Sequence, residues 1–349
     1  MKTMQAAVLT APGCFEVKEV LVPAVGPDDV LVKVDRCGIC GTDIHIFQGH
    51  YSSDRLPLIP GHEFVGTIHC MGEKVSGLDM GQRVVADINV GCGHCYFCRK
   101  NEILNCSEMQ QIGIHRDGGF AEYVMVPARQ IIKAPADVPL EVLALTEPVA
   151  CVVRAARKSG IGFGQSVVVL GAGPIGNLHI QMMRLIGAAP VIAVELSSER
   201  AALALQAGAD VVITQASNVL DIVKKETDGR GADVVIESIG SPALYAQSFE
   251  LIRRGGHVAA FGITGPDDIV PLKILDTVLR ENSIKGSVAG MGEDMYDALT
   301  LLTHGRFRVE PFIQSVVALS GIQAAFESLG KNPGILKVQI YPDRNKSVL

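Results

Sequence analysis

The stretch Ser166-Val-Val-Val-Leu170, continued by Gly171-Ala-Gly-Pro-Ile-Gly176, decides the fold of the second half of this chain. The apolar run reads as a buried strand, and Ile175–Gly187 behind it reads as a helix. Gly171 makes the tight turn, Gly173 lets the backbone approach a pyrophosphate, and Gly176 lets helix and strand pack closely. The start of the helix offers free N–H groups and a positive dipole to phosphates. We therefore expect a dinucleotide site here.

The acidic residue expected about 20 positions after such a turn is Glu195, which follows the strand-like Val191–Val194. A carboxylate there accepts hydrogen bonds from ribose hydroxyls and repels a 2′-phosphate, so the pattern favours NAD over NADP. Arg200 lies close enough in sequence to accommodate a 2′-phosphate. Further cofactor contacts are expected at Pro174, Ile175, Gly262 and Ile263.

The pattern of expected strands and helices along the chain predicts two domains, as does its length of 349 residues. From about residue 166, strand-like and helix-like runs alternate, which predicts an α/β fold with a doubly wound parallel sheet. Residues 1 to about 150 are instead β-rich, with short segments such as Val30–Val34 and Phe64–Ile68 between turn residues. The alternation of strands and helices that begins near residue 166 stops near residue 290, which suggests that the C-terminal segment returns to the first domain.

Four cysteines with the spacing C-x2-C-x2-C-x7-C predict a closed metal site in the β-rich part. Four thiolates complete a tetrahedron around Zn²⁺ and leave no open position, as a structural zinc site requires. The spacing also allows an iron–sulfur cluster, but nothing else in the sequence demands electron transfer. The expected structural ligands are Cys92, Cys95, Cys98 and Cys106.

A second constellation is dispersed along the chain and predicts an open zinc site. Cys40 and His62 both lie in glycine-flanked turns, and an acidic residue would complete three protein ligands. Glu63 and Glu147 are the candidates for the acid. Spacing alone does not choose between them, nor between Cys37 and Cys40.

Together these motifs resemble the zinc-dependent medium-chain dehydrogenase/reductase family. CGICGTDIH, PGHEFVG, the four-cysteine lobe, LTEPVAC and VVVLGAGPIG occur in the order of that family over the whole chain. The resemblance implies a GroES-like catalytic domain over residues 1–153 with a zinc lobe at about 88–110. It also implies a Rossmann domain over 154–289, and a segment over 290–349 that returns to the catalytic domain.

The same resemblance implies roles for single residues. Cys40 and His62 correspond to catalytic zinc ligands, and Glu63 to an adjacent ligand or exchange partner. Glu147 corresponds to a glutamate that binds zinc directly or through water. Thr42 and His45 correspond to the family's proton relay.

The sequence looks nearest to the sorbitol, sugar-acid and threonine dehydrogenase branch. We therefore expect two zinc ions per chain and NAD-linked oxidation of a secondary hydroxyl of a polyol, sugar acid or related compound to a ketone. An L-threonine 3-dehydrogenase is the alternative among enzymes, and a non-catalytic nucleotide-binding zinc protein is the alternative outside them.

Composition narrows the class of partner. A hydrophobic content of 48% excludes a disordered chain, and a net charge of −6 argues against nucleic acid and membrane surfaces. No stretch has the length of a membrane span or the pattern of a signal peptide. Nine cysteines in such a chain favour metal binding in the cytoplasm. The expected partner is a small-molecule substrate, and the resemblance implies a homodimer or homotetramer.

Overall fold

The computed structural model describes residues 2–329 and 331–343. Its described residues form two compact units, and each is considered by itself. Unit 1 takes in Met1–Ala150, Met291–His304 and Phe312–Leu349, and unit 2 takes in Cys151–Gly290 and Gly305–Pro311. The short segment Gly305–Pro311 therefore groups with unit 2, although the whole of 290–349 was expected to return to the first domain. Gln181 accounts for this, because its side-chain amide binds the backbone N–H and C=O of Arg308 at 2.6 and 3.1 Å.

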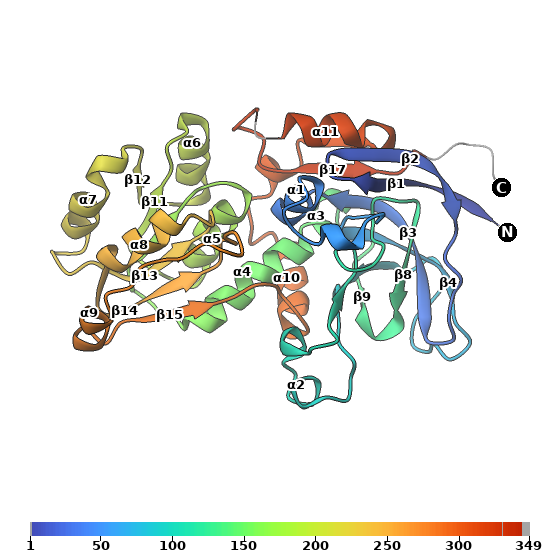
Figure 1. Cartoon of the computed structure of the whole chain (residues 1–349), viewed down its shortest axis with the longest axis horizontal. Coiled ribbons are helices and arrows are strands. Elements are labelled where there is room, and N and C mark those ends of the chain that lie inside the picture. Colours follow the sequence, from blue (N-terminus) through green and yellow to red (C-terminus); the bar gives the residue numbers. More distant parts are fainter. Residues whose placement is uncertain (1, 330, 344–349) are drawn as a thin grey trace. The chain divides into compact units, whose positions relative to one another are not determined.

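Unit 1 is built around a largely antiparallel sheet in the order β16–β17–β3–β4–β5–β9, in which β8 also pairs with β3. These strands are β3 (Asp29–Gly38), β4 (Glu63–Met71), β5 (Arg83–Ala86), β8 (Tyr123–Pro127), β9 (Ile131–Lys133), β16 (Ser315–Ala318) and β17 (Val338–Tyr341). β17 pairs with the end of β3 through Gln339–Gly38 and Ile340–Cys37. A strand from the end of the chain thus lies beside the Cys37–Cys40 stretch (Figure 1).

The remaining elements of unit 1 surround this sheet. They are the hairpin β1 (Thr3–Ala11) and β2 (Cys14–Leu21), the pair β6 (Asn89–Val90) and β7 (Gln110–Gln111), and helices α1 (Gly41–Phe47), α2 (Tyr96–Arg99), α3 (Leu140–Leu143), α10 (Glu293–Thr303) and α11 (Ile322–Ser328). The β1–β2 hairpin was not predicted. Its Phe15 packs in the core against Phe47 and Phe326, with ring centroids 5.5 and 4.9 Å apart. α4 (Thr146–Ser159) begins in unit 1 and ends in unit 2.

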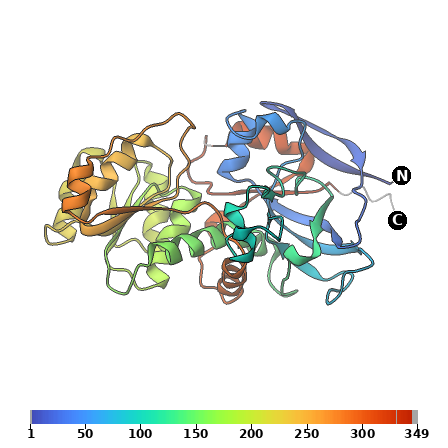
Figure 2. The same cartoon turned by 60° about the horizontal axis from the view of Figure 1, so that its bottom comes forward.

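Unit 2 confirms the predicted doubly wound fold. Its all-parallel sheet has the order β12–β11–β10–β13–β14–β15, which is 3-2-1-4-5-6 along the chain. The strands are β10 (Val167–Leu170), β11 (Val191–Val194), β12 (Val211–Ile213), β13 (Ala232–Glu237), β14 (Ile252–Ala260) and β15 (Ser283–Gly286). The helices are α5 (Pro174–Leu185), α6 (Ser198–Ala207), α7 (Val219–Glu226), α8 (Pro242–Leu251) and α9 (Ile274–Leu279), and they cover both faces of the sheet (Figure 2). In this order the connections reverse direction between β10 and β13, where dinucleotides bind in such sheets.

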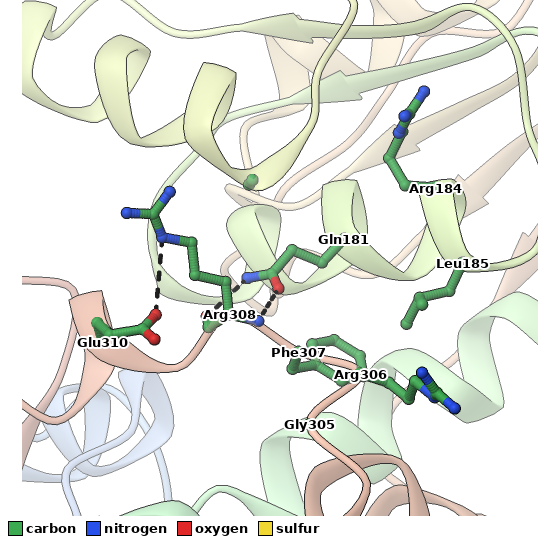
Figure 3. Close-up of a pocket in the computed structure, with 9 residues that line it drawn as sticks. Gln181, Arg184, Leu185, Gly305, Arg306, Phe307, Arg308 and Glu310 are labelled. Carbon is green, nitrogen blue, oxygen red and sulfur yellow. Dashed lines mark hydrogen bonds and ion pairs between the residues drawn. The ribbon is translucent and has the colours of Figure 1, made fainter.

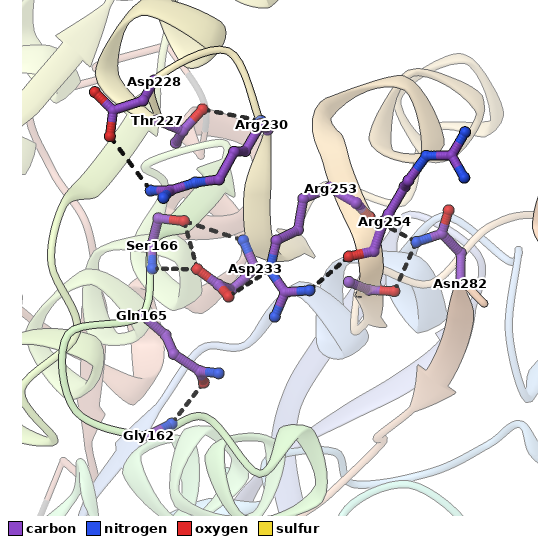
Figure 4. Close-up of polar contacts among 12 residues, drawn as sticks. Gly162, Gln165, Ser166, Thr227, Asp228, Arg230, Asp233, Arg253, Arg254 and Asn282 are labelled. Carbon is purple, nitrogen blue, oxygen red and sulfur yellow. Dashed lines mark hydrogen bonds and ion pairs between the residues drawn. The ribbon is translucent and has the colours of Figure 1, made fainter. Parts of the chain in front are cut away.

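A polar cluster ties the amino ends of the central strands together (Figure 4). Asp233 Oδ2 accepts hydrogen bonds from the backbone N–H and the hydroxyl of Ser166, at 2.8 and 2.7 Å. Asp233 Oδ1 accepts a hydrogen bond of 2.6 Å from Arg253 Nε. Burial alone would raise the pKa of Asp233, but Ser166 and Arg253 outweigh it and lower the pKa. This cluster holds the register of β10, β13 and β14 at the edge opposite to the glycine-rich turn.

None of the helices in the described parts of the chain combines the length and the apolar character needed to cross a bilayer.

Candidate metal and nucleotide sites

The four-cysteine lobe forms between β6 and β7 and has the geometry of a tetrahedral metal site. The Sγ atoms of Cys92, Cys95, Cys98 and Cys106 all lie within 4.8 Å of one another. Cys92 Sγ and Cys98 Sγ are 3.9 Å apart. Zn–S bonds of about 2.3 Å imply S···S separations of about 3.8 Å, so the set fits zinc. Backbone N–H groups of Cys95 and Cys98 donate to the Sγ atoms of Cys92 and Cys95, at 3.4 Å in each case.

The second set comes from the β3–β4 pair. Gly38 at the end of β3 is opposite Glu63 at the start of β4, and Cys40 lies at the N-terminus of α1. Ligand atoms of Cys40, His62 and Glu63 lie within 4.8 Å of one another. Gly61 has φ +97°, and a side chain there would collide with Phe120 and Cys37, so the turn before His62 requires glycine. A thiolate, an imidazole and a carboxylate are the donor types of an open zinc site.

Asp43 is a functional residue that the sequence argument missed. Its Oδ2 accepts a hydrogen bond of 2.8 Å from the Cys40 backbone N–H, and its Oδ1 lies 3.2 Å from His62 Nδ1. Burial alone would lower the pKa of His62, but Asp43 and Cys40 together outweigh burial and raise it. The carboxylate therefore orients both the Cys40 turn and the imidazole, as partners of metal ligands do. Its position three residues after the helix cap was the available signal.

Lys337 is a second residue that was missed. Its Nζ lies 2.6 and 2.7 Å from the two carboxylate oxygens of Glu63, and 3.2 Å from the Ile39 carbonyl oxygen. The side chains are 4% and 0% exposed, so this is a buried ion pair. Burial alone would lower the pKa of Lys337, but the nearby charges of Glu63, Cys40 and Glu147 together outweigh it and raise the pKa. A lysine between Leu336 and Val338, in a strand-like stretch, was the available signal.

The other predicted catalytic residues lie differently. Glu147 is buried in the first turn of α4, and its carboxylate is not part of the Cys40, His62 and Glu63 group. Thr42 Oγ1 lies 3.9 Å from Cys40 Sγ. His45 follows Thr42 by about one turn of α1 and is exposed, with its ring centroid 6.4 Å from that of His50.

The glycine-rich turn of unit 2 has the conformation that a dinucleotide requires. Gly171 has φ +90°, and a Cβ on Gly176 would overlap the Gly171 carbonyl oxygen. A Cβ on Gly173 would meet nothing nearer than Arg200 Nη1 at 3.8 Å, so the glycine leaves room for a ligand. Gly173 is the N-cap of α5 and Pro174 begins the helix, so free N–H groups face this room. The cradle fits a pyrophosphate.

Glu195 and Arg200 flank this turn. Glu195 Oε2 accepts a hydrogen bond of 2.9 Å from the Ala172 backbone N–H, and Oε1 accepts one of 2.9 Å from Ser197 N–H. Each oxygen keeps a second lone pair, so the carboxylate can still accept a hydroxyl. The Ser197 hydroxyl caps α6 by accepting from the Arg200 backbone N–H.

Gly262 and Ile263 follow β14 at the carboxyl edge of the same sheet. The Gly262 N–H donates to the Glu237 carbonyl oxygen at 2.9 Å, and its carbonyl accepts from the Tyr245 hydroxyl at 2.6 Å. The Ile263 side chain is 52% exposed. The structure thus leaves this segment accessible at the edge where the glycine-rich turn lies.

A pocket of about 510 Å³ lies elsewhere on unit 2 (Figure 3). It is lined by the ends of α5 and α6 and by Gly305–Glu310. Three arginines border it, but Arg184 is paired with Asp210 at 3.2 Å and Arg308 with Glu310 at 3.6 Å. Figure 3 shows their guanidinium groups pointing apart. None of the predicted site residues lines this pocket.

Comparison with known proteins places both units in one family. Residues 26–136 match the model of the alcohol dehydrogenase GroES-like domain, and residues 174–304 match that of zinc-binding dehydrogenases. An L-threonine 3-dehydrogenase from Caldanaerobacter subterraneus subsp. tengcongensis is 35% identical over 328 residues, which cover 92% of this chain and 93% of the relative. A sorbitol dehydrogenase from Halalkalibacterium halodurans is 34% identical over 345 residues, which cover 97% of this chain and 99% of the relative.

A solved structure agrees with these matches. A zinc-binding dehydrogenase from Sinorhizobium meliloti 1021, bound to NADP, superposes with a TM-score of 0.91 at 34% identity. The alignment covers 98% of this chain and 100% of that structure.

Proposed function

Since this chain belongs to the zinc-binding alcohol dehydrogenase family, we propose that it oxidises a secondary hydroxyl of a polyol, sugar acid or related compound to a ketone, with NAD as the hydride acceptor. Family membership makes it an oxidoreductase that acts on alcohols with NAD(P). The observation that carries the proposal is the convergence of Cys40, His62 and Glu63 in unit 1 of a chain whose unit 2 has the dinucleotide turn.

For the metals, we assign structural zinc to the four-cysteine lobe and catalytic zinc to Cys40 and His62. Lys337 engages both oxygens of Glu63, so a bond from Glu63 to the metal would compete with this ion pair for the same carboxylate charge. This supports Glu63 as an exchange partner and not as a permanent ligand. Glu147 stands outside the group, which supports contact with the metal through water.

The residues of the chain handle the proton. Zinc, when bound, supplies a Lewis acid that makes the substrate hydroxyl more acidic. Thr42 lies beside the Cys40 thiol, where its hydroxyl can accept a proton from the substrate and pass one on. His45 is exposed on the same helix, where its imidazole can pass a proton to solvent. Hydride transfer to the dinucleotide is the chemistry of the cofactor, and the protein supplies orientation.

Two substrate classes, polyols and L-threonine, are supported by relatives of this chain. The sorbitol dehydrogenase that covers 97% of this chain supports a polyol. The L-threonine 3-dehydrogenase at 35% identity supports L-threonine as a second candidate. The two differ chemically, because L-threonine carries an ammonium and a carboxylate and a polyol carries neither.

The experiment is NAD reduction measured across sorbitol, xylitol, an aldonate and L-threonine, together with zinc content by mass spectrometry. We expect turnover of one class and about two zinc ions per chain, falling to about one with loss of activity in Cys40→Ser. Cys14→Ser is the matched control, since Cys14 is exposed and outside both ligand sets. Unchanged zinc in Cys40→Ser would refute the metal assignment, and no turnover of any compound would refute the substrate classes.

The preference for NAD is proposed on the carboxylate of Glu195. The Sinorhizobium meliloti dehydrogenase is bound to NADP, so the choice needs its own measurement. We expect kcat/KM to be higher with NAD than with NADP and the preference to weaken in Glu195→Ser. Higher kcat/KM with NADP in the native chain would overturn it.

We also propose that two copies of this chain associate through β15, the edge strand of the parallel sheet. All residues of β15 are exposed, and large apolar side chains occur before, within and after it in the chain. Ile269, Ile274, Leu275, Val278, Leu279, Ile284 and Val288 are each more than half exposed. An edge strand of this kind presents unpaired backbone groups, and a second copy related by a two-fold axis covers them with the same strand.

The cysteines, which all lie in the described residues, form no disulfide, which supports a reducing compartment such as the cytoplasm.

A further inference from the structure

Glu237 is a buried carboxylate at the centre of the predicted cofactor crevice. It is the last residue of β13 and pairs with Leu170, the last residue of β10 before the glycine-rich turn. The strand order reverses between these two strands, so the dinucleotide crosses the sheet above them. The side chain is 0% exposed.

The carboxylate organises the loop that follows β13. Its oxygens accept hydrogen bonds from three successive backbone N–H groups, at 3.2 Å from Ile239, 2.9 and 3.0 Å from Gly240, and 3.3 Å from Ser241. These three N–H groups are all donors, and the Glu237 carboxylate is their acceptor. The loop is therefore wrapped around one side chain.

That loop is locked to the glycine-rich turn on one side. The Ser238 hydroxyl donates to the Leu170 carbonyl oxygen at 2.7 Å. A Cβ on Gly171 would lie 2.6 Å from the Ile239 side chain, so the loop and the turn are in close contact.

On the other side the loop is locked to the segment after β14. A Cβ on Gly240 would overlap the Ile263 carbonyl oxygen, and one on Gly262 would overlap Glu237 Oε2. The Tyr245 hydroxyl donates to the Gly262 carbonyl oxygen at 2.6 Å. Glu237 and Tyr245 thus hold both loops at the carboxyl ends of β13 and β14.

These strands form the second mononucleotide half of the sheet. Glu195 ends β11 in the first half, where the adenosine ribose is expected. We therefore expect the nicotinamide nucleotide to bind at the half of the sheet that is built on β13 and β14. An oxidised nicotinamide ring carries a positive charge, and a reduced ring does not.

We propose that Glu237 is a positioning residue of the nicotinamide half-site, and that its buried negative charge favours oxidised over reduced cofactor. The inference rests on the proposed dinucleotide-dependent function. A charge without solvent around it acts over longer distances than one in water, so no direct contact with the ring is required.

The test compares three ligands on zinc-loaded Glu237→Gln, which keeps the size of the side chain and removes the charge. NADH is titrated by fluorescence, and NAD and ADP-ribose are measured by its displacement. ADP-ribose occupies the adenine half and lacks the nicotinamide. We expect the Kd of NAD to rise ~10-fold, that of NADH ~3-fold, and that of ADP-ribose less than ~2-fold.

Two further variants separate charge from positioning. Tyr245→Phe removes the hydrogen bond to Gly262 and keeps the carboxylate, so NAD and NADH should weaken equally while ADP-ribose is unaffected. Glu250→Gln removes an exposed carboxylate of α8 and should change none of the three. Equal weakening of all three ligands in Glu237→Gln, or an unchanged NAD/NADH ratio, overturns the proposal. If Glu237→Gln does not fold, an effect of Tyr245→Phe on ADP-ribose as large as that on NAD overturns it instead. Absence of NADH and ADP-ribose binding in the native chain would instead refute the proposed function.

Discussion

At the scale of the residue, the Glu63–Lys337 pair has the largest energetic consequence in the proposed zinc site. Both side chains are buried and each satisfies the charge of the other. Removing one member of such a pair leaves an uncompensated charge away from water, which costs more than the pair itself contributes. The pair therefore makes the fold of unit 1 depend on a residue beside the proposed metal ligands.

We predict that Lys337→Met lowers the free energy of unfolding by about 3 kcal/mol, because Glu63 loses its counter-charge. The double variant Glu63→Gln with Lys337→Met should recover most of that loss. Lys331→Met, at an exposed position of the same segment, should change stability by less than about 0.5 kcal/mol. Urea unfolding at equal zinc content measures all three, and a Lys337→Met protein as stable as the native one contradicts the argument.

His179 of α5 gives a prediction about pH. Its ring is fully buried against Phe261, with centroids 4.8 Å apart, and burial lowers its pKa to about 3. The unfolded chain takes up a proton near the ordinary pKa of about 6.5, whereas the folded chain does not. The contribution of this group is therefore complete above pH ~6.5 and is lost progressively as the pH falls towards 3.

Between pH 7 and pH 5 this group should cost the native protein about 2 kcal/mol of stability. His179→Leu lacks the titrating ring, so its stability should fall less over the same interval. Unfolding at several pH values, with zinc content checked at each, measures the difference in slope. Identical slopes for the two proteins would contradict a neutral, buried His179.

At the scale of the element, the four-cysteine lobe contrasts with the sheets. α2 has no buried residues, and β6 and β7 are short, so the lobe has little apolar core of its own. Small elements without a core depend on cross-links or metals for their order. The zinc that we assign here should therefore stabilise the lobe itself.

We predict that Cys98→Ser lowers zinc content from about two to about one per chain and makes residues 88–110 sensitive to proteolysis. Cys40→Ser should lose the same amount of zinc and leave the lobe resistant, which separates the two sites. Cys70→Ser, an exposed thiol outside both sites, is the control. Limited proteolysis with mass spectrometry reads the outcome, and a protected lobe in Cys98→Ser would refute its dependence on metal.

At the scale of the whole molecule, the apolar surface around β15 determines the expected assembly. Large exposed apolar patches on soluble proteins mark interaction sites. Because β15 ends the sheet and is exposed along its length, pairing with a second copy extends the sheet without rearranging it.

We predict that the native chain is at least a dimer and that Ile284→Asp with Leu275→Asp yields smaller species. Charges buried in an interface without partners weaken association strongly. Phe163→Asp, which alters an exposed side chain away from β15, should leave the assembly unchanged. Size-exclusion chromatography with light scattering measures the mass, and a monomeric native chain contradicts the proposal.

The sequence by itself determined what depends on neighbours along the chain. The strand, glycine turn and helix around Gly171–Gly176, the alternation of strands and helices in unit 2, and the spacing of the cysteines in the lobe all follow from local backbone geometry and periodicity. The sequence offered Cys40 and His62 as ligands but left the acid open between Glu63 and Glu147; the pairing of β3 with β4 is what brings Glu63 to the group.

Only the tertiary structure decided the partners that arrive from far away. Lys337 meets Glu63 across 274 residues, and it does so because β17 pairs with the end of β3. Asp43 Oδ1 lies 3.2 Å from His62 Nδ1, and the Gly262 N–H, from the segment after β14, donates to the Glu237 carbonyl oxygen. Spacing along the chain encodes neither contact. A buried charge requires a counterpart wherever the fold places one, and that place depends on strand pairing and desolvation, which no local pattern in the sequence specifies.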